Sequence, residues 1–255
     1  MRTLRLTISY DGTRFVGWQR QAEGVSIQGL LEEALARFDG APIAVHGAGR
    51  TDAGVHALGQ VASARLTSAY PTDVVVRGLN ACLPQDVRVI GVQEASANFH
   101  ARFSARSKTY RYLLHNAPTS SPFDRAFVWH VPESLDLNEM RTAAAALVGT
   151  HDFAAFRSAG SGTTETVRTI TRSELAADTV SGWDDTSRGM LLAYEVSGDG
   201  FLRHMVRAIV GTLVEIGRGR RPAASMAALL ASGSRAEAGA TAPPQGLFLV
   251  RVEYD

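Results

Sequence analysis

Hydrophobic and polar positions alternate from residue 3 to residue 10, which places Leu4, Leu6 and Ile8 on one side of an extended chain. A period of two is typical of a strand with one buried face. The same alternation, or a short β-branched run, recurs along the chain. We expect further strands at residues 42–45, 60–66, 87–92, 108–115, 166–176, 190–197 and 245–252.

Helical periodicity separates several of these strands. Apolar residues spaced three and four apart predict a first helix over residues 26–38, with an apolar stripe of Leu30, Leu31, Ala34, Leu35 and Phe38. Ser26 and Thr72 stand where a hydroxyl can cap the first two helices. We expect the other helices at residues 72–82, 135–148, 201–217 and 223–231.

The predicted elements up to residue 92 run strand, helix, strand, strand, helix, strand. This order resembles a ferredoxin-like split βαβ unit. The second half of the chain repeats strands and helices on the same plan without visible sequence repetition. We therefore expect an α+β fold with antiparallel sheets, built from an N-terminal half over residues 1–104 and a C-terminal half over residues 105–255.

Composition narrows the class of protein. The chain has 255 residues, of which 45% are hydrophobic and 20% charged, as in an ordinary globular protein. Nothing resembles a signal peptide and no apolar run reaches the length of a membrane span. The single Cys82 excludes an internal disulfide and is compatible with a reducing compartment. These features predict a cytoplasmic protein with no membrane segment.

Charge is distributed unevenly, although the net charge is only +1. Residues 1–111 hold 13 basic and 9 acidic groups, whereas residues 112–255 hold 13 basic and 16 acidic groups. We expect an anionic partner to bind chiefly to the first half.

A glycine-rich loop at residues 47–59 places Asp52 between two predicted strands, two residues after Arg50. Taken alone, Asp52 is most simply a turn former. A metal site made by His46, Asp52 and His56 is a second interpretation, although the spacing fits no standard zinc or calcium pattern. A phosphate-binding loop lacks the usual Gly-Lys-Ser/Thr ending. A catalytic carboxylate kept ionised by a nearby cation is the remaining interpretation.

Two segments combine cations with aromatic residues, as RNA-binding surfaces do. The first is the loop at residues 14–20, which also suits a hydrophobic anchor under a sheet. The second is residues 99–112, where alternation places Lys108 and Tyr110 on one face of a strand. In addition, Arg203 and Arg207 lie near a helix N-terminus, which the helix dipole disfavours unless each cation has an anionic partner.

The string Gly49-Arg50-Thr51-Asp52-Ala53-Gly54-Val55-His56 resembles the active-site motif of the TruA family of tRNA pseudouridine synthases. The resemblance covers nearly the whole chain and implies a pseudouridine synthase fold, whose two halves join across a central catalytic cleft. Ala208 stands where the family commonly has an asparagine. The other matching segments are residues 10–21, 107–116, 150–156 and 198–217.

The resemblance implies an isomerase that converts uridine to pseudouridine at positions 38, 39 and 40, in the anticodon stem-loop of tRNA. Asp52 starts the reaction, Arg207 keeps Asp52 ionised, and Tyr110 packs on the target base. The implied partners are tRNA and a second copy of the chain, with no cofactor and no metal, and the loop at residues 157–164 borders the RNA. The implied RNA contacts are Arg50, Tyr110, Arg14, Trp18, Gln19, Arg20, Arg203 and Lys108.

Three alternatives stay open. The nearest is a pseudouridine synthase with other target positions. A tRNA-binding module without chemistry would keep the basic and aromatic segments but would not need Asp52. A metal-dependent hydrolase would use His46, Asp52 and His56, and would lose its activity in chelator.

Overall fold

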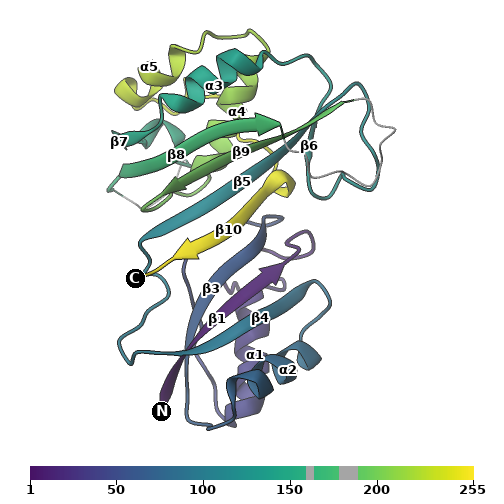
Figure 1. Cartoon of the computed structure of the whole chain (residues 1–255), viewed down its shortest axis with the longest axis vertical. Coiled ribbons are helices and arrows are strands. Elements are labelled where there is room, and N and C mark those ends of the chain that lie inside the picture. Colours follow the sequence, from purple (N-terminus) through teal and green to yellow (C-terminus); the bar gives the residue numbers. More distant parts are fainter. Residues whose placement is uncertain (159–163, 178–188) are drawn as a thin grey trace. The chain divides into compact units, whose positions relative to one another are not determined.

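The computed structural model describes residues 1–158, 164–177 and 189–255, and the chain forms two compact units (Figure 1). Unit 1 comprises residues 1–108 and 248–255, and unit 2 comprises residues 109–247. Both units combine a sheet with helices, so the predicted α+β class is confirmed. Most of the predicted loop at residues 157–164 lies outside the described residues.

Unit 1 is built on an antiparallel sheet in the order β4-β1-β3, with β2 also paired to β3. This is the order of the predicted split βαβ unit. The last strand of the chain, β10, runs parallel to β3 and pairs Phe248 with His56. The elements of unit 1 are β1 (Arg2–Tyr10), α1 (Ile27–Asp39), β2 (His46–Gly47), β3 (His56–Leu66), α2 (Thr72–Cys82), β4 (Val87–Ala95) and most of β10 (Leu247–Glu253).

The core of unit 1 follows from the alternation in β1, since Leu4, Leu6 and Ile8 are fully buried. Ser26 caps α1, because its Oγ accepts a hydrogen bond of 3.2 Å from the Gly29 N–H. The buried stripe of α1 is shifted toward its N-terminus relative to the prediction, with Ile27 buried and Phe38 only half-buried.

Two local predictions in unit 1 are wrong. Residues 42–45 form no strand, and the strand before the Asp52 loop is only His46–Gly47. A strand this short is defined by its partner β3 and not by its own sequence pattern. Thr72 is the first residue of α2 and not its cap: Pro71 holds the cap position, and no side chain caps that end.

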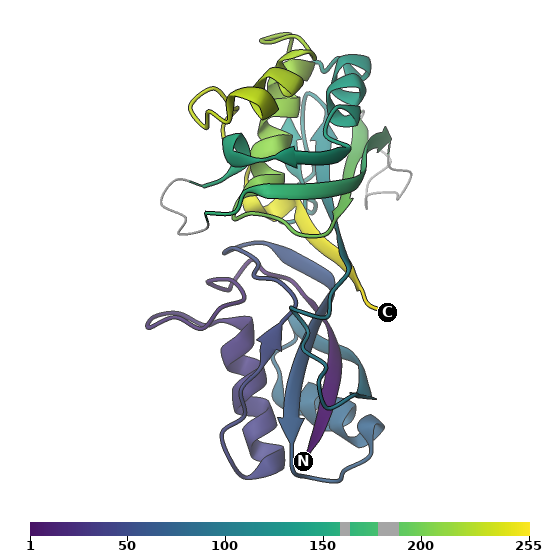
Figure 2. The same ribbon diagram turned by 90° about the vertical axis from the view of Figure 1, so that its left-hand side faces the viewer.

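Unit 2 is built on a sheet in the order β5-β9-β8-β7, in which β8 is antiparallel to both β9 and β7. A short strand, β6, pairs parallel to β5. Helices α3, α4 and α5 lie together (Figure 2). The elements are β5 (Ser107–Asn116), β6 (Trp129–Val131), α3 (Leu137–Ala145), β7 (Gly149–Asp152), β8 (Val167–Ala177), β9 (Met190–Gly198), α4 (Met205–Gly217), α5 (Ser225–Ser232) and two 3₁₀ turns, η1 (Ala154–Phe156) and η2 (Pro244–Gly246).

Helix α4 is the centre of the unit 2 core. Eleven of its 13 residues are buried, so the one-sided stripe that the sequence predicts is too narrow. The loop at residues 233–243 accounts for the difference, because it covers the remaining side: a Cβ on Gly211 would lie 1.7 Å from the Ala240 carbonyl oxygen. Arg207 and Glu215 are the two residues of α4 that stay partly exposed.

The strand pair β8 and β9 and the closing strand β10 are confirmed, whereas β6 and β7 were not predicted. Both missed strands are too short, at three and four residues, to show a period of two. In the part of the chain that the structure describes, no helix has the length and apolar character that crossing a membrane requires.

Candidate active site

The loop that carries Asp52 connects β2 to β3 in unit 1. It begins where the Ala48 N–H donates to the Val61 carbonyl oxygen, at 2.8 Å, and ends at the first residue of β3. Inside it the Val55 N–H donates to the carbonyl oxygen of Asp52, at 3.1 Å, and Gly54 has a φ of 76°. The Asp52 backbone therefore forms a turn, and the residue is half-buried.

A second loop, at residues 11–18, packs against the Asp52 loop backbone to backbone. The Trp18 N–H donates to the Thr51 carbonyl oxygen at 3.0 Å. A Cβ on Gly12 would lie 2.0 Å from the Val55 carbonyl oxygen, and one on Gly17 would lie 2.6 Å from that of Thr51. Gly17 also has a φ of 105°. Only glycine permits this approach, so these two glycines set the position of the loop.

Buried polar side chains of β1 and β3 also hold the Asp52 loop. The Tyr10 hydroxyl and the Thr51 hydroxyl form a hydrogen bond of 2.8 Å, and the Gln60 amide donates to the Gly49 carbonyl oxygen at 2.9 Å. Burial raises the pKa of Tyr10 to about 12, so the phenol stays protonated and able to donate at neutral pH. Gly49 and Thr51, which flank Arg50, are thereby tied to strands β3 and β1.

His56 follows the Asp52 loop and is 1% exposed. Its ring stacks on Phe248, with 4.7 Å between ring centroids. Its Nδ1 lies 3.0 Å from the Gly12 N–H and 3.1 Å from Asp11 Oδ1. A neutral ring protonated on Nε2 accepts the hydrogen bond from Gly12, whereas a protonated Nδ1 pairs with the Asp11 carboxylate. His56 therefore joins the N-terminal loop, the Asp52 loop and β10.

The structure gives no support to the metal interpretation of His46, Asp52 and His56. The His46 ring stacks on the ring of His100, and His56 is engaged as described above. Among residues 1–158, 164–177 and 189–255, no three histidine, cysteine, aspartate or glutamate side chains are grouped so that they could hold a metal ion.

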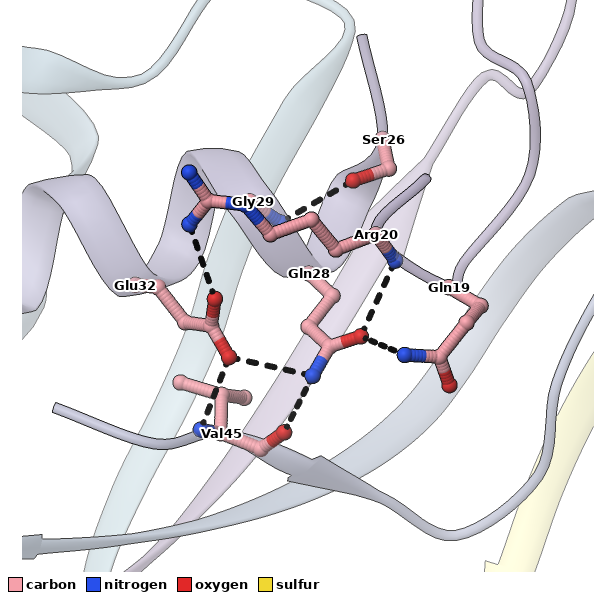
Figure 3. A network of polar contacts seen from close by, with 7 residues as sticks. All are labelled: Gln19, Arg20, Ser26, Gln28, Gly29, Glu32 and Val45. Atoms are coloured by element: carbon pink, nitrogen blue, oxygen red, sulfur yellow. Dashed lines mark hydrogen bonds and ion pairs between the residues drawn. The ribbon is translucent and has the colours of Figure 1, made fainter. Parts of the chain in front are cut away.

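Gln19 and Arg20 belong to a polar network that joins their loop to α1 (Figure 3). The side-chain Oε1 of Gln28 accepts hydrogen bonds from the Gln19 side-chain amide, at 2.7 Å, and from the Arg20 backbone N–H, at 3.0 Å. The Gln28 amide donates to Glu32 and to the Val45 carbonyl oxygen, and Glu32 pairs with the Arg20 guanidinium at 3.2 Å. This network fixes the shape of residues 19–21.

The predicted RNA-contacting residues of unit 1 differ in exposure. Arg50 is exposed, the side chain of Arg14 is 80% exposed and that of Arg20 is 59% exposed. Trp18 is 2% exposed and its ring lies against Gly47, where a Cβ would come within 2.4 Å of it. Trp18 thus occupies the position of a hydrophobic anchor, the other interpretation that the sequence allowed. Lys108, the last residue of the first segment of unit 1, is half-buried.

Tyr110 lies on β5 in unit 2 and is 7% exposed. Its ring contacts Phe201 edge to face, with 5.0 Å between centroids and 75° between planes. Tyr112, two residues further along, is fully buried, and its hydroxyl donates to the Pro243 carbonyl oxygen at 2.8 Å. Tyr112 is therefore part of the core of unit 2.

The start of α4 carries the two predicted arginines. His204 precedes the helix with a φ of 63°, a left-handed conformation that is uncommon for a residue with a side chain. Arg203 is exposed, and its carbonyl oxygen accepts from the Ser158 N–H at 3.1 Å. The Arg207 Nε donates to the Ala242 carbonyl oxygen at 2.8 Å, so its guanidinium is oriented by the loop that covers α4.

Residues 6–104 and 143–255 match the family model described as tRNA pseudouridine synthase. The chain belongs to the tRNA pseudouridine synthase family. The family resemblance carried by residues 49–56 is thus confirmed, and so is the prediction of an isomerase that acts on tRNA uridine.

Relatives of this pseudouridine synthase align over its full length. It is 44% identical over 254 residues to tRNA pseudouridine synthase A of Geotalea uraniireducens, with 100% of both chains covered. It is 46% identical to the protein of that name from Syntrophotalea carbinolica and 48% identical to that from Myxococcus xanthus, with 100% of this chain and 97% and 92% of those chains covered. A chain in a solved H/ACA RNP bound to a substrate RNA covers 83% of the enzyme at a TM-score of 0.35 and 9% identity, which is too weak a likeness to carry an argument.

Sequence reasoning missed the residues that support the Asp52 loop, namely Tyr10, Thr51, Gln60 and His56. Thr51 and His56 stand inside the matching motif, and Tyr10, Gly12 and Gly17 stand inside the matching N-terminal segment. Two glycine-containing stretches in the sequence could have indicated this support. The need for glycine at these positions is explained only by the contact between the two loops in space.

Proposed function

We propose that this enzyme isomerises uridine to pseudouridine in the anticodon stem-loop of tRNA, at positions 38, 39 and 40, with Asp52 as the catalytic nucleophile. The observation that carries the proposal is the fixed position of the Asp52 loop, which is built from backbone contacts at Gly12 and Gly17 and from the buried Tyr10–Thr51 pair. A rigid loop that presents one half-buried carboxylate suits a group that must meet a reacting atom within a fraction of an ångström.

In the proposed reaction the uridine leaves the base stack, which costs a few kcal/mol. Asp52 then starts cleavage of the bond between uracil and ribose, either by attack on the sugar or the base or by removal of a ribose proton. The freed uracil rejoins the ribose through its carbon 5, so no atom is gained or lost. Arg207 is the proposed cation that keeps Asp52 ionised, and Tyr110 packs on the uracil and assists proton transfer.

Around this site we propose that exposed cations bind the tRNA backbone. Arg14, Arg20, Arg50 and Arg203 are exposed, and Lys108 adds a half-buried ammonium. Trp18 and Gln19 act in RNA binding by holding the shape of the loop that carries Arg14 and Arg20, because one is buried and the amide of the other is bonded to Gln28. We further propose that the enzyme works in the cytoplasm as a homodimer and that residues 157–164 border the RNA.

The decisive experiment replaces the carboxylate and keeps the loop. We expect Asp52→Asn to lower the rate of pseudouridine formation by at least about 10⁴-fold, because the nucleophile is removed. Its dissociation constant for unmodified tRNA should stay within about threefold of wild type. Asp73→Asn is the matched control, since this exposed carboxylate forms a surface ion pair with Arg77 at the start of α2, and it should leave both quantities unchanged.

The position of the product tests the proposed target. When tRNA from cells that lack the gene is treated with the purified enzyme, it should gain pseudouridine at positions 38, 39 and 40. Product elsewhere in the tRNA would establish the alternative of other target positions. If Asp52→Asn converted the tRNA fully, Asp52 would not be the nucleophile. Loss of activity in chelator would favour a metal-dependent reaction.

A further inference from the structure

Three aromatic rings form a connected surface cluster in unit 1, which we call the aromatic platform: His46, His100 and Phe103. The His46 and His100 rings stack with 5.0 Å between centroids and 27° between planes. The Phe103 ring contacts His100 at 4.4 Å. Phe103 is 76% exposed and His46 is exposed as well. The platform thus presents a large apolar ring to solvent. The His100 ring packs against Phe103, and the His46 ring packs against His100.

The turn that carries Phe103 is rigid, so the exposure of the ring is built into the fold. His100 Nδ1 accepts from the Arg102 N–H at 3.1 Å, and the Ser104 N–H donates to the His100 carbonyl oxygen at 2.9 Å. Ala101 is fully buried: its N–H donates to Ser63 on β3 at 3.1 Å, and its carbonyl oxygen accepts from the Tyr254 hydroxyl at 2.7 Å. A ring held out of the core by a pinned turn loses little entropy on binding.

The segment that carries Phe103 is rich in basic residues, since residues 95–111 contain four of them and no acidic residue. Arg106 forms an ion pair with Asp255 and Arg111 forms one with Glu195, so Arg102 is the cation beside the ring. The Arg102 guanidinium lies over the Phe103 ring, 5.6 Å from its centroid. Burial, and then the neighbouring His46, lower the pKa of His100, so at neutral pH this imidazole is an uncharged flat ring. An exposed aromatic ring next to a guanidinium is the combination that stacks a nucleobase and neutralises the phosphate beside it.

The platform lies close along the chain to the catalytic loop. His46 is six residues before Asp52, and six residues of extended chain span at most about 20 Å. An RNA that places one nucleotide at Asp52 therefore has further nucleotides within reach of the platform.

We propose that the aromatic platform binds tRNA by stacking Phe103 on an unpaired base other than the reacting uridine, while Arg102 contacts an adjacent phosphate. The proposal deepens the proposed function and rests on tRNA being the substrate. A second copy of this chain is the competing occupant. The observations favour RNA, since an exposed ring with a guanidinium over it suits base stacking beside a phosphate, whereas protein-binding surfaces are larger, contiguous apolar patches.

The experiment measures the dissociation constant for unmodified tRNA in the Asp52→Asn background, where no turnover occurs. We expect Phe103→Ala to raise it about tenfold, since loss of one base–aromatic stack weakens binding by this order. Phe103→Trp should restore binding to within about twofold. Phe123→Ala is the matched control in unit 2, because Phe123 is 75% exposed, and it should change binding by less than about twofold.

Salt dependence separates stacking from charge. Phe103→Ala should leave the slope of log affinity against log salt unchanged, whereas Arg102→Gln should reduce it by about 1. The platform proposal is overturned if Phe103→Ala binds tRNA as tightly as Phe123→Ala. It is also overturned if Phe103→Ala changes only the oligomeric state in sedimentation. Pseudouridine formed outside the anticodon arm would instead overturn the proposed target positions. The ratio of the tRNA dissociation constants of Phe103→Ala and Phe123→Ala would still test whether the platform binds tRNA.

Discussion

The two units follow one plan and fix their proposed functional groups in different ways. In unit 1 the sequence β1, α1, β2, β3, α2 gives the sheet order β1-β3-β2. In unit 2, apart from the short strands β6 and β7 and the turn η1, the sequence β5, α3, β8, β9, α4 gives the order β5-β9-β8. Unit 1 presents Asp52 from a loop whose backbone lies against other backbone at Gly12 and Gly17. Unit 2 presents Tyr110 from a strand and Arg207 from a helix, both positioned by packed side chains and a backbone carbonyl.

This difference predicts how well each unit should tolerate amino-acid substitutions. A contact between two backbones leaves no room for even one methyl group, and neither partner can rotate away. A contact between two side chains adjusts by degrees, because rotamers and neighbours relax. We therefore expect an abrupt response to substitution in unit 1 and a graded response in unit 2.

The largest effect is expected for Gly12→Ala. Its Cβ would lie 2.0 Å from the Val55 carbonyl oxygen, so the Asp52 loop must move. We expect the free energy of unfolding to fall by about 3 kcal/mol and turnover to fall by about 10²-fold, as a displacement of about 1 Å would cause. Urea denaturation and single-turnover kinetics measure the two quantities.

Gly91→Ala is the control for Gly12→Ala. Gly91 lies in β4 with no atom within 4 Å of an added Cβ, and its φ is not positive. We expect this substitution to change the free energy of unfolding by less than about 1 kcal/mol. If both alanine variants were equally stable and active, backbone contact would not position the Asp52 loop, and the comparison would fail.

A graded effect on stability is expected at Tyr110, which reaches the size of the Gly12→Ala effect only when the whole ring is removed. Tyr110→Ala removes a buried ring and its contact with Phe201, which should lower the free energy of unfolding by about 3 kcal/mol. Tyr110→Leu should lower the free energy of unfolding by less than Tyr110→Ala does. Tyr110→Phe should lower it by less than about 1.5 kcal/mol, because Phe keeps the ring. Thermal unfolding of the series measures the order.

The same Tyr110 series separates packing from chemistry. Because Tyr110→Phe keeps the ring but not the hydroxyl, a large loss of turnover in this variant would assign proton transfer to the hydroxyl. Equal destabilisation by Phe, Leu and Ala would show an all-or-none site in unit 2 and would remove the contrast with unit 1.

The smallest effect is expected from pH. Burial lowers the pKa of His100 in unit 1 and of His115 in unit 2, each with a second histidine adding to the shift. The unfolded chain therefore binds more protons than the folded chain below about pH 6.5, so stability should fall as pH drops through that value. We expect the melting temperature to decrease from pH 7.5 to pH 5.0, and to decrease less in His115→Gln. A melting temperature that rises on acidification in this range would contradict the sign.

The sequence by itself determined the elements whose signal is local. The alternation in β1, the Ser26 cap of α1, the pair β8 and β9 and the family motif at residues 49–56 are all readable within a dozen residues, because one buried face or one capping bond leaves its mark there. Family membership followed from the motif for the same reason.

Only the tertiary structure decided the features that depend on a distant partner. The strand β2 exists because Ser63 and Ala62 pair with it, and Trp18 is buried because Gly47 leaves space for its ring. Gly12 and Gly17 acquire their role only when the Asp52 loop lies against them, and eleven of the 13 residues of α4 are buried because a later loop covers the side that the rest of unit 2 leaves open. Burial and close approach are properties of pairs, and a pattern within one segment cannot specify its partner.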